Sequence, residues 1–363
     1  MAQRLRVLLL IPHLGGGGAE QVTALLARGL SRHKYELHLG LVTESNSAQK
    51  ALPPWVQVHL LGALRVRLAA LKLLRLVRNV RPDLVLSGMA HLNFLVLLLR
   101  PLFPPGTRVI VRQNTTVTSA LAGAGLPWYT YFLYRLLYRQ ADRIICQSRD
   151  MADDLATALG TRQEQIAVLP NPVDLATIRD ATENPNGQGV HWRGPGPHLL
   201  AVGRLAHEKG FDLLIEALLV VRRVFPHADL VVAGSGPAEC ALKAQSASLG
   251  LEAEVRFAGQ VDCPYIFFPG ASLFVLSSRY EGMPNALLEA AAGGLPIVAT
   301  PASGGVVDLL GVRPGAWIAP QVSASSLAST LLTALSSLEP GQRFPAPQSH
   351  TRTPERPLAA YVG

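Results

Sequence analysis

LRVLLLIPHLGGGGAEQVTALLARGLSRHKYELHLGLVT, residues 5–43, joins an apolar run, a glycine loop, a helical pattern and a second strand-like run. The apolar run covers residues 5–11, apolar residues recur at helical spacing over 19–33, and residues 35–43 form the second run. A strand, a helix and a second strand in this order predict the βαβ unit from which parallel, doubly wound α/β sheets are built.

The same alternation continues to about residue 338. Further strand-like runs lie at residues 82–88, 107–113, 141–148, 165–171, 198–205, 228–236, 254–260, 272–278 and 294–300. Gly, Pro and Asn interrupt the pattern at residues 183–197, and Pro-rich sequence follows residue 339. We therefore predict two Rossmann-like α/β/α domains facing across a cleft at the carboxyl ends of their strands: an N-terminal domain at 1–180, a linker at 181–197, a C-terminal domain at 198–338 and an irregular tail at 339–363.

Composition indicates a globular protein rather than a membrane-spanning or disordered one. Hydrophobic residues make up 49% of the 363 residues and charged residues 16%. No apolar run approaches the 18 residues of a spanning helix, and the first strand is not followed by a signal-peptide cleavage pattern. The three cysteines, Cys146, Cys240 and Cys263, are odd in number and far apart, so we expect neither a disulfide framework nor a zinc site. This cysteine usage fits a protein of the reducing cytoplasm.

Positive charge is concentrated in the first half of the chain. Residues 1–180 carry 21 Lys and Arg against 11 Asp and Glu, whereas residues 181–363 carry 12 against 14. The segment RVRLAALKLLRLVRNVR, residues 65–81, combines leucines at helical spacing with arginines. It predicts an amphipathic basic helix, which either meets an anionic membrane surface or packs on the domain with a solvated basic face. No nucleic-acid-binding module accompanies it, so we expect no nucleic acid partner.

Glycines follow the first predicted strand at Gly15, Gly16, Gly17 and Gly18, just before a helix. Glycine lets the backbone approach a ligand closely, and the amino end of a helix favours phosphate. The loop lacks the spaced glycines of a dinucleotide site and the Gly-Lys-Ser/Thr of a nucleoside triphosphate site. A plain flexible loop remains the alternative.

Two motifs in the second half carry charged residues at predicted strand ends. In GRLAHEKGFD, residues 203–212, Arg204 and Lys209 suit a diphosphate, unless both are simply solvated. In SRYEGMPNALLEAAAGGLPIVAT, residues 278–300, Glu281 lies outside a predicted helix and Glu289 inside it, where they could reach different hydroxyls of one ligand. In the alternative interpretation, Glu281 only stabilises the helix dipole and Glu289 is a surface residue.

In this order, GGGGAE, GRLAHEKGFD, VVAGSGPAE, FAGQV and the two-glutamate motif resemble the retaining glycosyltransferases of family 4, which have the GT-B fold. The resemblance covers residues 5–335, and RQN with EGMPNALLEA is similar to members that build bacterial surface polysaccharides, lipopolysaccharide and lipid-linked oligosaccharides. It implies transfer of a hexose or N-acetylhexosamine from a nucleotide diphosphate sugar, a UDP sugar above others, to a lipid-linked or glycan acceptor. It also implies that the first domain binds the acceptor and the second the donor, with no metal and no other cofactor.

The resemblance assigns roles residue by residue. Arg204 and Lys209 would hold the donor diphosphate, Glu281 would contact the donor sugar, and these three would be catalytic; Glu289 would bind the ribose hydroxyls. Other donor contacts would come from Gly16, Gly17, Gly259, Val261, Gly282, Met283, Pro284 and Asn285. Residues expected on the acceptor side are Gly18, Glu20, His91, Gln113 and Asn114.

This chain departs from the family pattern in two places. Many members have a histidine where this chain has RQNTT, residues 112–116, and neither Gln113 nor Asn114 can take up a proton at neutral pH. His13 and His91 are the substitutes nearby, and the carboxyl end is shorter than usual for the family. These departures leave two alternatives open: a non-catalytic partner subunit, and a sugar-nucleotide epimerase or hydrolase on the same fold.

We expect a cytoplasmic enzyme, peripheral on the anionic inner face of the membrane. No pattern in the sequence specifies the sugar, the acceptor, the linkage or the oligomeric state.

Overall fold

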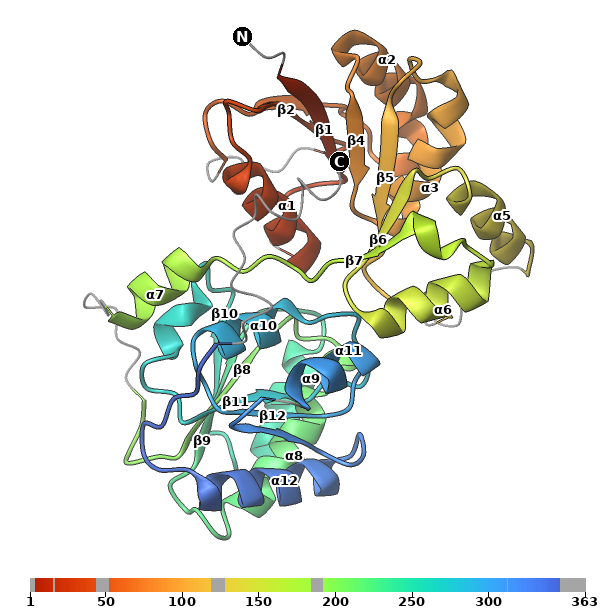
Figure 1. The fold of residues 1–363 in the computed structure, drawn as a ribbon. Coiled ribbons are helices and arrows are strands. Elements are labelled where there is room, and N and C mark those ends of the chain that lie inside the picture. The colour runs from red at the N-terminus through yellow and green to blue at the C-terminus, as the bar shows by residue number, and fades with distance from the viewer. Residues whose placement is uncertain are drawn as a thin grey trace. The chain divides into compact units, whose positions relative to one another are not determined.

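The computed structural model describes residues 4–15, 17–43, 52–118, 128–183, 192–311 and 313–346. These residues form two compact units, the first ending at Pro172 and the second beginning at Val173 (Figure 1). Each unit is built on one sheet in which every paired strand is parallel, so the predicted pair of α/β domains is confirmed.

The sheet of the first unit has the strand order β3-β2-β1-β4-β5-β6-β7. The strand β3 was not predicted, because its four residues QVHL are mostly exposed at the sheet edge and lack a continuous apolar run. The seven strands are β1 (Leu5–Ile11), β2 (Tyr35–Leu41), β3 (Gln57–Leu60), β4 (Leu84–Ser87), β5 (Arg108–Arg112), β6 (Arg143–Cys146) and β7 (Ile166–Val168).

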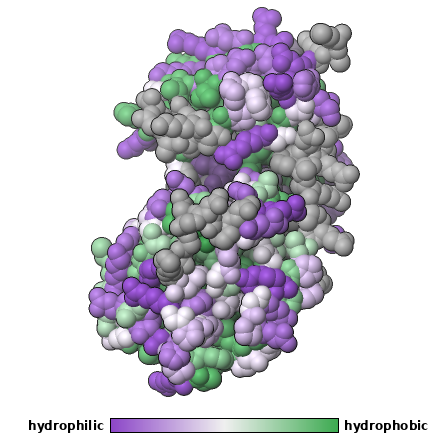
Figure 2. Space-filling model, turned by 90° about the vertical axis from the view of Figure 1, so that its left-hand side faces the viewer, coloured by the Kyte–Doolittle hydropathy of each residue, from purple (hydrophilic) through white to green (hydrophobic). Residues whose placement is uncertain are grey.

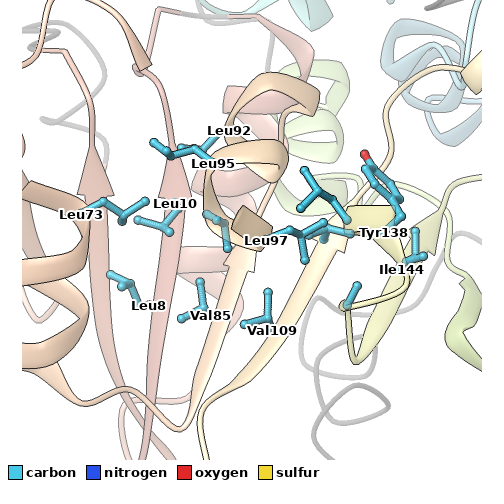
Figure 3. Packing of buried hydrophobic residues seen from close by; sticks show 14 of the residues in the cluster. Leu8, Leu10, Leu73, Val85, Leu92, Leu95, Leu97, Val109, Tyr138 and Ile144 are labelled. Carbon is cyan, nitrogen blue, oxygen red and sulfur yellow. The ribbon is translucent and has the colours of Figure 1, made fainter. Parts of the chain in front are cut away.

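Alternate residues of these strands pack against helices on opposite faces, as the two-residue period of a strand requires. Val7 and Leu9 lie in the cluster with α1, whereas Leu8 and Leu10 lie in the cluster with α2, α3, α5 and α6, part of which Figure 3 shows. The helices are α1 (Gly18–Gly29), α2 (Ala70–Val80), α3 (Ala90–Leu99), α5 (Trp128–Tyr138) and α6 (Arg149–Leu159), with short 3-10 turns at Val66–Ala69, Arg100–Leu102 and Gln163–Gln165.

The second unit repeats this plan with the strand order β10-β9-β8-β11-β12-β13. Leu200 and Phe274 face one side of its sheet, and their neighbours Leu199 and Leu273 face the other. Its strands are β8 (His198–Val202), β9 (Asp229–Ala233), β10 (Val255–Gly259), β11 (Leu273–Leu276), β12 (Ile297–Ala299) and β13 (Ala316–Ile318), of which only β13 was not predicted.

The helices α8 and α12 cover one face of this sheet, with α9 beside them, and α7, α10 and α11 contribute to the other apolar cluster. Their bounds are α7 (Leu175–Glu183), α8 (Phe211–Val221), α9 (Glu239–Ser248), α10 (Asn285–Ala292), α11 (Gly304–Leu310) and α12 (Ala324–Ser337), with 3-10 turns at His207–Lys209 and Pro264–Phe267.

The division between the units falls after Pro172, whereas the sequence predicted that the first domain ends at residue 180. Val173 and Ile178 are buried in a core of the second unit, so α7 packs with that unit rather than with the first sheet. Residues 184–191 of the expected linker and residues 347–363 of the expected tail lie outside the described residues. The described start of the tail packs on the second unit, because Arg343 donates hydrogen bonds to the carbonyl oxygens of Phe268 and Ala271.

Apolar side chains fill the interiors, and on the face that Figure 2 shows hydrophobic residues are scattered between hydrophilic ones. Among the described residues, no helix is both long and apolar enough to cross a bilayer.

Candidate functional site

Lys209 and Glu281 meet at the carboxyl ends of two neighbouring strands of the second sheet. Lys209 ends the 3-10 turn that follows β8, and Glu281 lies in the loop that follows β11. The Lys209 Nζ is 2.5 Å from the Glu281 Oε1, and the Ser278 hydroxyl donates to the same oxygen at 2.8 Å. The chain reverses its direction of winding between β8 and β11, and in open α/β sheets ligands bind at this place. The two motifs predicted from the sequence are therefore one cluster.

The two loops that carry this pair are held together by hydrogen bonds. Gly210 has a φ of +60°, and a Cβ there would lie 2.1 Å from the Ser277 carbonyl oxygen, so only glycine fits. The Ser277 hydroxyl in turn donates to the carbonyl oxygen of Lys209 at 2.8 Å. Arg279 grips both carboxylate oxygens of Asp212 at 2.6 and 2.7 Å. The hydrogen bonds from Arg279 lower the pKa of Asp212 although partial burial opposes them. These contacts hold the backbone that carries the Lys209 side chain in place.

Arg204 lies on the same loop but makes a separate ion pair. Its guanidinium is mostly exposed and donates to Glu208 at 2.5 Å. Burial raises the pKa of the Glu208 carboxyl, but backbone hydrogen bonding and Arg204 outweigh it, and the pKa is lowered overall. A single contact to Glu208 leaves most of the five guanidinium N–H donors available to an anionic ligand.

Glu289 is buried in the second turn of α10, contrary to the alternative that it is a surface residue. Burial raises the pKa of this carboxyl to about 7; a hydrogen bond from Tyr265 opposes the shift, and the nearby Asp174 carboxylate adds to it. A carboxyl at this pKa gains or loses its proton readily near neutral pH. Sequence reasoning missed Tyr265 and Asp174, because nothing separates Tyr265 from the other aromatic residues of CPYIFF.

The turns after β9 and β10 contact the loop of Arg204 directly. A Cβ at Gly234 would lie 1.9 Å from the Gly203 carbonyl oxygen, and the Gly234 amide donates to the Gly259 carbonyl oxygen at 2.8 Å. Close packing of three strand ends therefore explains the glycines of GSGPAE without a dinucleotide. Gly259 has a φ of +70° with open space where a Cβ would be, and Val261 is half-buried in the apolar cluster that includes Tyr265.

The loop before α10 is bonded to the segment that follows β12. The Glu281 amide donates to the Ala302 carbonyl oxygen at 3.1 Å, and the Ser303 hydroxyl donates to the Gly282 carbonyl oxygen at 3.0 Å. Pro284 is the residue before the first helical residue, Asn285, as the sequence predicted. Gly282, Met283, Pro284 and Asn285 thus lead from Glu281 into the helix that carries Glu289.

In the first unit, the Glu20 side chain lies against the backbone of the glycine loop. Gly17 caps α1, and a Cβ there would lie 2.3 Å from Glu20 Oε2. The buried Glu20 carboxylate lies in the first turn of α1, where it stabilises the helix dipole, and its Oε1 is 3.5 Å from His13 Nδ1. Gly18 is the first residue of α1, and Gly16 lies outside the described residues.

The polar side chains that follow β5 form hydrogen bonds within the first unit. Gln113 is 1% exposed, and the Tyr138 hydroxyl donates to its Oε1 at 2.7 Å. Asn114 donates to the Gly88 carbonyl oxygen and accepts from Gln147 at 3.0 Å. Asn114 thus links the segments that follow β4, β5 and β6, whereas Gln113 is bonded to the last residue of α5. His91, on α3, is different: it lines a pocket, and burial together with His13 lowers its pKa.

The structure thus brings together Lys209 and Glu281 directly, places Arg204 on the loop of Lys209, and places Glu289 on the helix that follows Glu281. Within the described residues, no three His, Cys, Asp or Glu side chains are arranged to bind a metal ion.

Comparisons with known proteins show which family this chain resembles. The family model "Glycosyl transferases group 1" matches residues 188–344, and the model "Glycosyltransferase Family 4" matches residues 16–177. The chain is 29% identical over 316 residues to the N-acetylgalactosamine-N,N'-diacetylbacillosaminyl-diphospho-undecaprenol 4-alpha-N-acetylgalactosaminyltransferase of Campylobacter jejuni, covering 84% of this chain and 82% of the relative. It is 36% identical over 179 residues to mannosylfructose-phosphate synthase of Agrobacterium fabrum, covering 46% of this chain and only 39% of the relative.

A solved structure similar to this chain is Anabaena HepE in complex with UDP and glucose. The TM-score is 0.77, 99% of each chain is covered, and 18% of the residues are identical. At that identity the likeness shows a shared fold.

Proposed function

This chain belongs to the family 4 glycosyltransferases with the GT-B fold, and on that basis we propose that it transfers a hexose or N-acetylhexosamine from a UDP sugar to a lipid-linked acceptor, with retention of the anomeric configuration. The observation that carries the donor side is the Lys209–Glu281 pair at the winding reversal of the second sheet. HepE, which has the same fold, binds UDP and glucose, and the Campylobacter relative is named for a diphospho-undecaprenol acceptor.

The charges of the cluster suit a diphosphate that leaves the sugar. Lys209 donates one N–H to Glu281, and its other two N–H groups can donate to phosphate oxygens. The planar guanidinium group of Arg204 adds further N–H donors. As the bond between the anomeric carbon and the diphosphate breaks, negative charge grows on the phosphate, where these cations stabilise it. The acceptor hydroxyl then bonds to the anomeric carbon from the same face, and its proton passes to the leaving diphosphate.

The two carboxyl groups bind hydroxyls in this scheme. Glu281, already oriented by Lys209 and Ser278, accepts from a hydroxyl of the donor sugar. Glu289, ionised when the nucleotide is bound, accepts from the ribose hydroxyls, with Gly259 and Val261 beside the base.

A transfer screen tests the proposed function. UDP, GDP and ADP sugars are incubated with a lipid extract and the wild-type protein, and we expect one UDP sugar to be transferred. Lys209→Ala and Glu281→Gln should each lower the rate at least about 100-fold, since each removes a contact to the reacting donor. An α-linked product from an α-linked donor, identified by NMR, is expected; an inverted product would contradict retention.

Arg222 and Glu254 provide a matched control. They form a half-buried ion pair at 3.0 Å in the same unit, with Glu254 just before β10, at the opposite end of the strands. Arg222→Ala and Glu254→Gln should leave transfer within a few-fold of wild type. Donor binding without transfer in any extract, or free sugar as the sole product, would overturn the transferase assignment in favour of a partner subunit or a hydrolase.

We also propose that the first unit associates with an anionic membrane surface. Residues 52–82 contain six Lys and Arg and no Asp or Glu. The segment expected as one helix at 65–81 is a 3-10 turn followed by α2, with Leu64, Leu68 and Leu71 largely exposed beside the cations. Exposed leucines among unopposed cations suit a surface of acidic lipids. We expect sedimentation with phosphatidylglycerol vesicles at low salt and release as salt rises; absence of binding at low salt would contradict the proposal.

A further inference from the structure

A pocket lies at the carboxyl ends of four strands of the first sheet. Its volume is about 480 Å³, and its lining comes from the segments that follow β1, β2, β3 and β4: Pro12, His13, Val42, Thr43, Leu64, Arg65, Val66, Arg67 and His91. In the order β3-β2-β1-β4, the winding reverses between β1 and β4, which contribute His13 and His91. As in the second sheet, this is the place where open α/β sheets bind ligands.

The pocket is cationic and has no carboxylate in its lining. Arg65 and Arg67 are exposed, and within the described part of the chain neither side chain has an ion-pair or hydrogen-bond partner. The Glu20 carboxylate lies 3.5 Å from His13 Nδ1 but does not line the pocket. Two guanidinium groups with no counter-charge at one pocket favour a phosphate or diphosphate group.

The histidines can add neutral donors to this pocket. The Gly15 amide donates to His13 Nδ1 at 3.1 Å, so in the neutral ring the proton of His13 lies on Nε2. Burial and the neighbouring His13 lower the pKa of His91, which keeps its imidazole uncharged at neutral pH. Hydrogen bonds to a phosphate ester are therefore available without further positive charge.

The rest of the lining is apolar and continues to an apolar surface. Pro12, Val42, Val66 and Leu64 line the pocket, and Leu64 begins the row of exposed leucines that includes Leu68 and Leu71. A ligand that fills this site has a phosphate group at one end and a hydrocarbon chain at the other. We propose that the pocket binds the diphosphate ester of the lipid-linked acceptor, with Arg65 and Arg67 as its cationic contacts. This inference rests on the proposed function and assigns its acceptor subsite.

Geranyl diphosphate is a soluble probe for this site. Its binding is measured by calorimetry in the presence of saturating UDP, which occupies the donor site, with geraniol as the comparison. We expect geranyl diphosphate to bind and geraniol not to bind. The double variant Arg65→Gln/Arg67→Gln should weaken binding by about tenfold or more, because two charge-assisted contacts are lost.

A charge-matched control separates the pocket from the general charge of the surface. Arg75→Gln/Arg78→Gln removes two exposed cations of α2 that do not line the pocket. This variant should keep geranyl diphosphate binding within about twofold, whereas both double variants should lose binding to phosphatidylglycerol vesicles to a similar extent. Equal weakening of geranyl diphosphate binding in both variants would overturn the proposal. So would unchanged geranyl diphosphate binding in Arg65→Gln/Arg67→Gln with loss of vesicle binding alone, because the arginines would then meet bulk lipid headgroups.

The transfer screen distinguishes a failure of this inference from a failure of the proposed function. If wild type transfers sugar to lipid and Arg65→Gln/Arg67→Gln has an unchanged KM for the lipid acceptor, the pocket assignment alone is wrong. If wild type transfers no sugar, the proposed function is wrong, whatever geranyl diphosphate does. UDP binding in both double variants shows that the second unit is folded, and an unchanged unfolding transition of the first unit in calorimetry shows that the first unit is folded.

Discussion

At the scale of the residue, the candidate donor site consists of carboxyl groups in two different environments. Glu281 is ion-paired with Lys209 and hydrogen-bonded by Ser278. Glu289 is buried with a Tyr265 hydrogen bond but no cation described beside it, so burial raises its pKa to about 7. The ion pair and the hydrogen bond hold the Glu281 carboxylate in place, whereas burial makes the ionisation of Glu289 depend on pH and on the ligand.

The pKa of Glu289 predicts a pH dependence of nucleotide binding. Ribose hydroxyls donate to an ionised carboxylate, so UDP should bind more tightly as pH rises from about 5.5 to 7 and level off above that. Below pH 7 the affinity should fall by up to about tenfold per pH unit. Glu289→Gln carries no titrating group and serves as the reference for any pH effect of the UDP phosphate itself. Parallel Kd profiles for wild type and Glu289→Gln, measured by calorimetry, would contradict the assignment.

At the scale of the element, the edge of the first sheet contains a pair of histidines on neighbouring strands. His38 of β2 and His59 of β3 stack, with 3.0 Å between His38 Nδ1 and His59 Nε2. Burial lowers the pKa of both, and a charge on His59 lowers the pKa of His38 further. Glu36 faces His38 from the same strand at 3.5 Å and opposes this shift, while Arg6 of β1 adds to it. The β2–β3 edge therefore favours two uncharged rings.

Acid should loosen this edge. The folded-state pKa values lie below the ordinary 6.5, so the stability that the neutral pair contributes is present above pH 6.5 and is lost as pH falls through the lowered values. Hydrogen exchange of the Leu61 amide, which is bonded to the Leu41 carbonyl oxygen, should speed up below pH 6 relative to its intrinsic rate. His59→Gln should reduce this pH dependence, and the exposed His33→Gln should not. An equal response in both variants would exclude the pair as the cause.

At the scale of the whole molecule, each unit has its own sheet and its own apolar clusters. Leu8 is buried between the first sheet and its helices, and Phe274 is buried in the second sheet. The proposed nucleotide contacts Glu289 and Lys209 belong to the second unit, and the unopposed cations belong to the first. The proposed donor contacts and the proposed membrane and acceptor contacts thus belong to different cores.

Core truncations should separate the two units in calorimetry. Phe274→Ala should destabilise the second unit by about 3–5 kcal/mol and lower the unfolding transition that UDP raises. Leu8→Ala, expected to cost about 2–5 kcal/mol, should lower a transition that responds less to UDP. If both substitutions lowered the same transition by the same amount, with the same response to UDP, the units would not unfold as separate cores.

Local pattern in the sequence was sufficient to predict the two parallel sheets, the loops that carry Arg204, Lys209 and Glu281, and the helix that carries Glu289. Strand periodicity and glycine turns are short-range properties of the sequence. Strands such as those at residues 5–11 and 273–276 can therefore be predicted without tertiary context. The edge strands β3 and β13 were missed because neither has a continuous buried run, and their pairing with a neighbour makes them strands.

Only the tertiary structure decided which polar residues are free to act. It showed that the side chains of Gln113 and Asn114 are hydrogen-bonded within the first unit, that Tyr265 and Asp174 contribute to the environment of Glu289, and that α7 belongs with the second core. It also placed Arg65, Arg67 and His91 at one pocket, although they are far apart from His13 in the chain. The physical reason is that hydrogen-bond partners, burial and shared pockets depend on contacts between distant segments, which the spacing of residues along one segment does not contain.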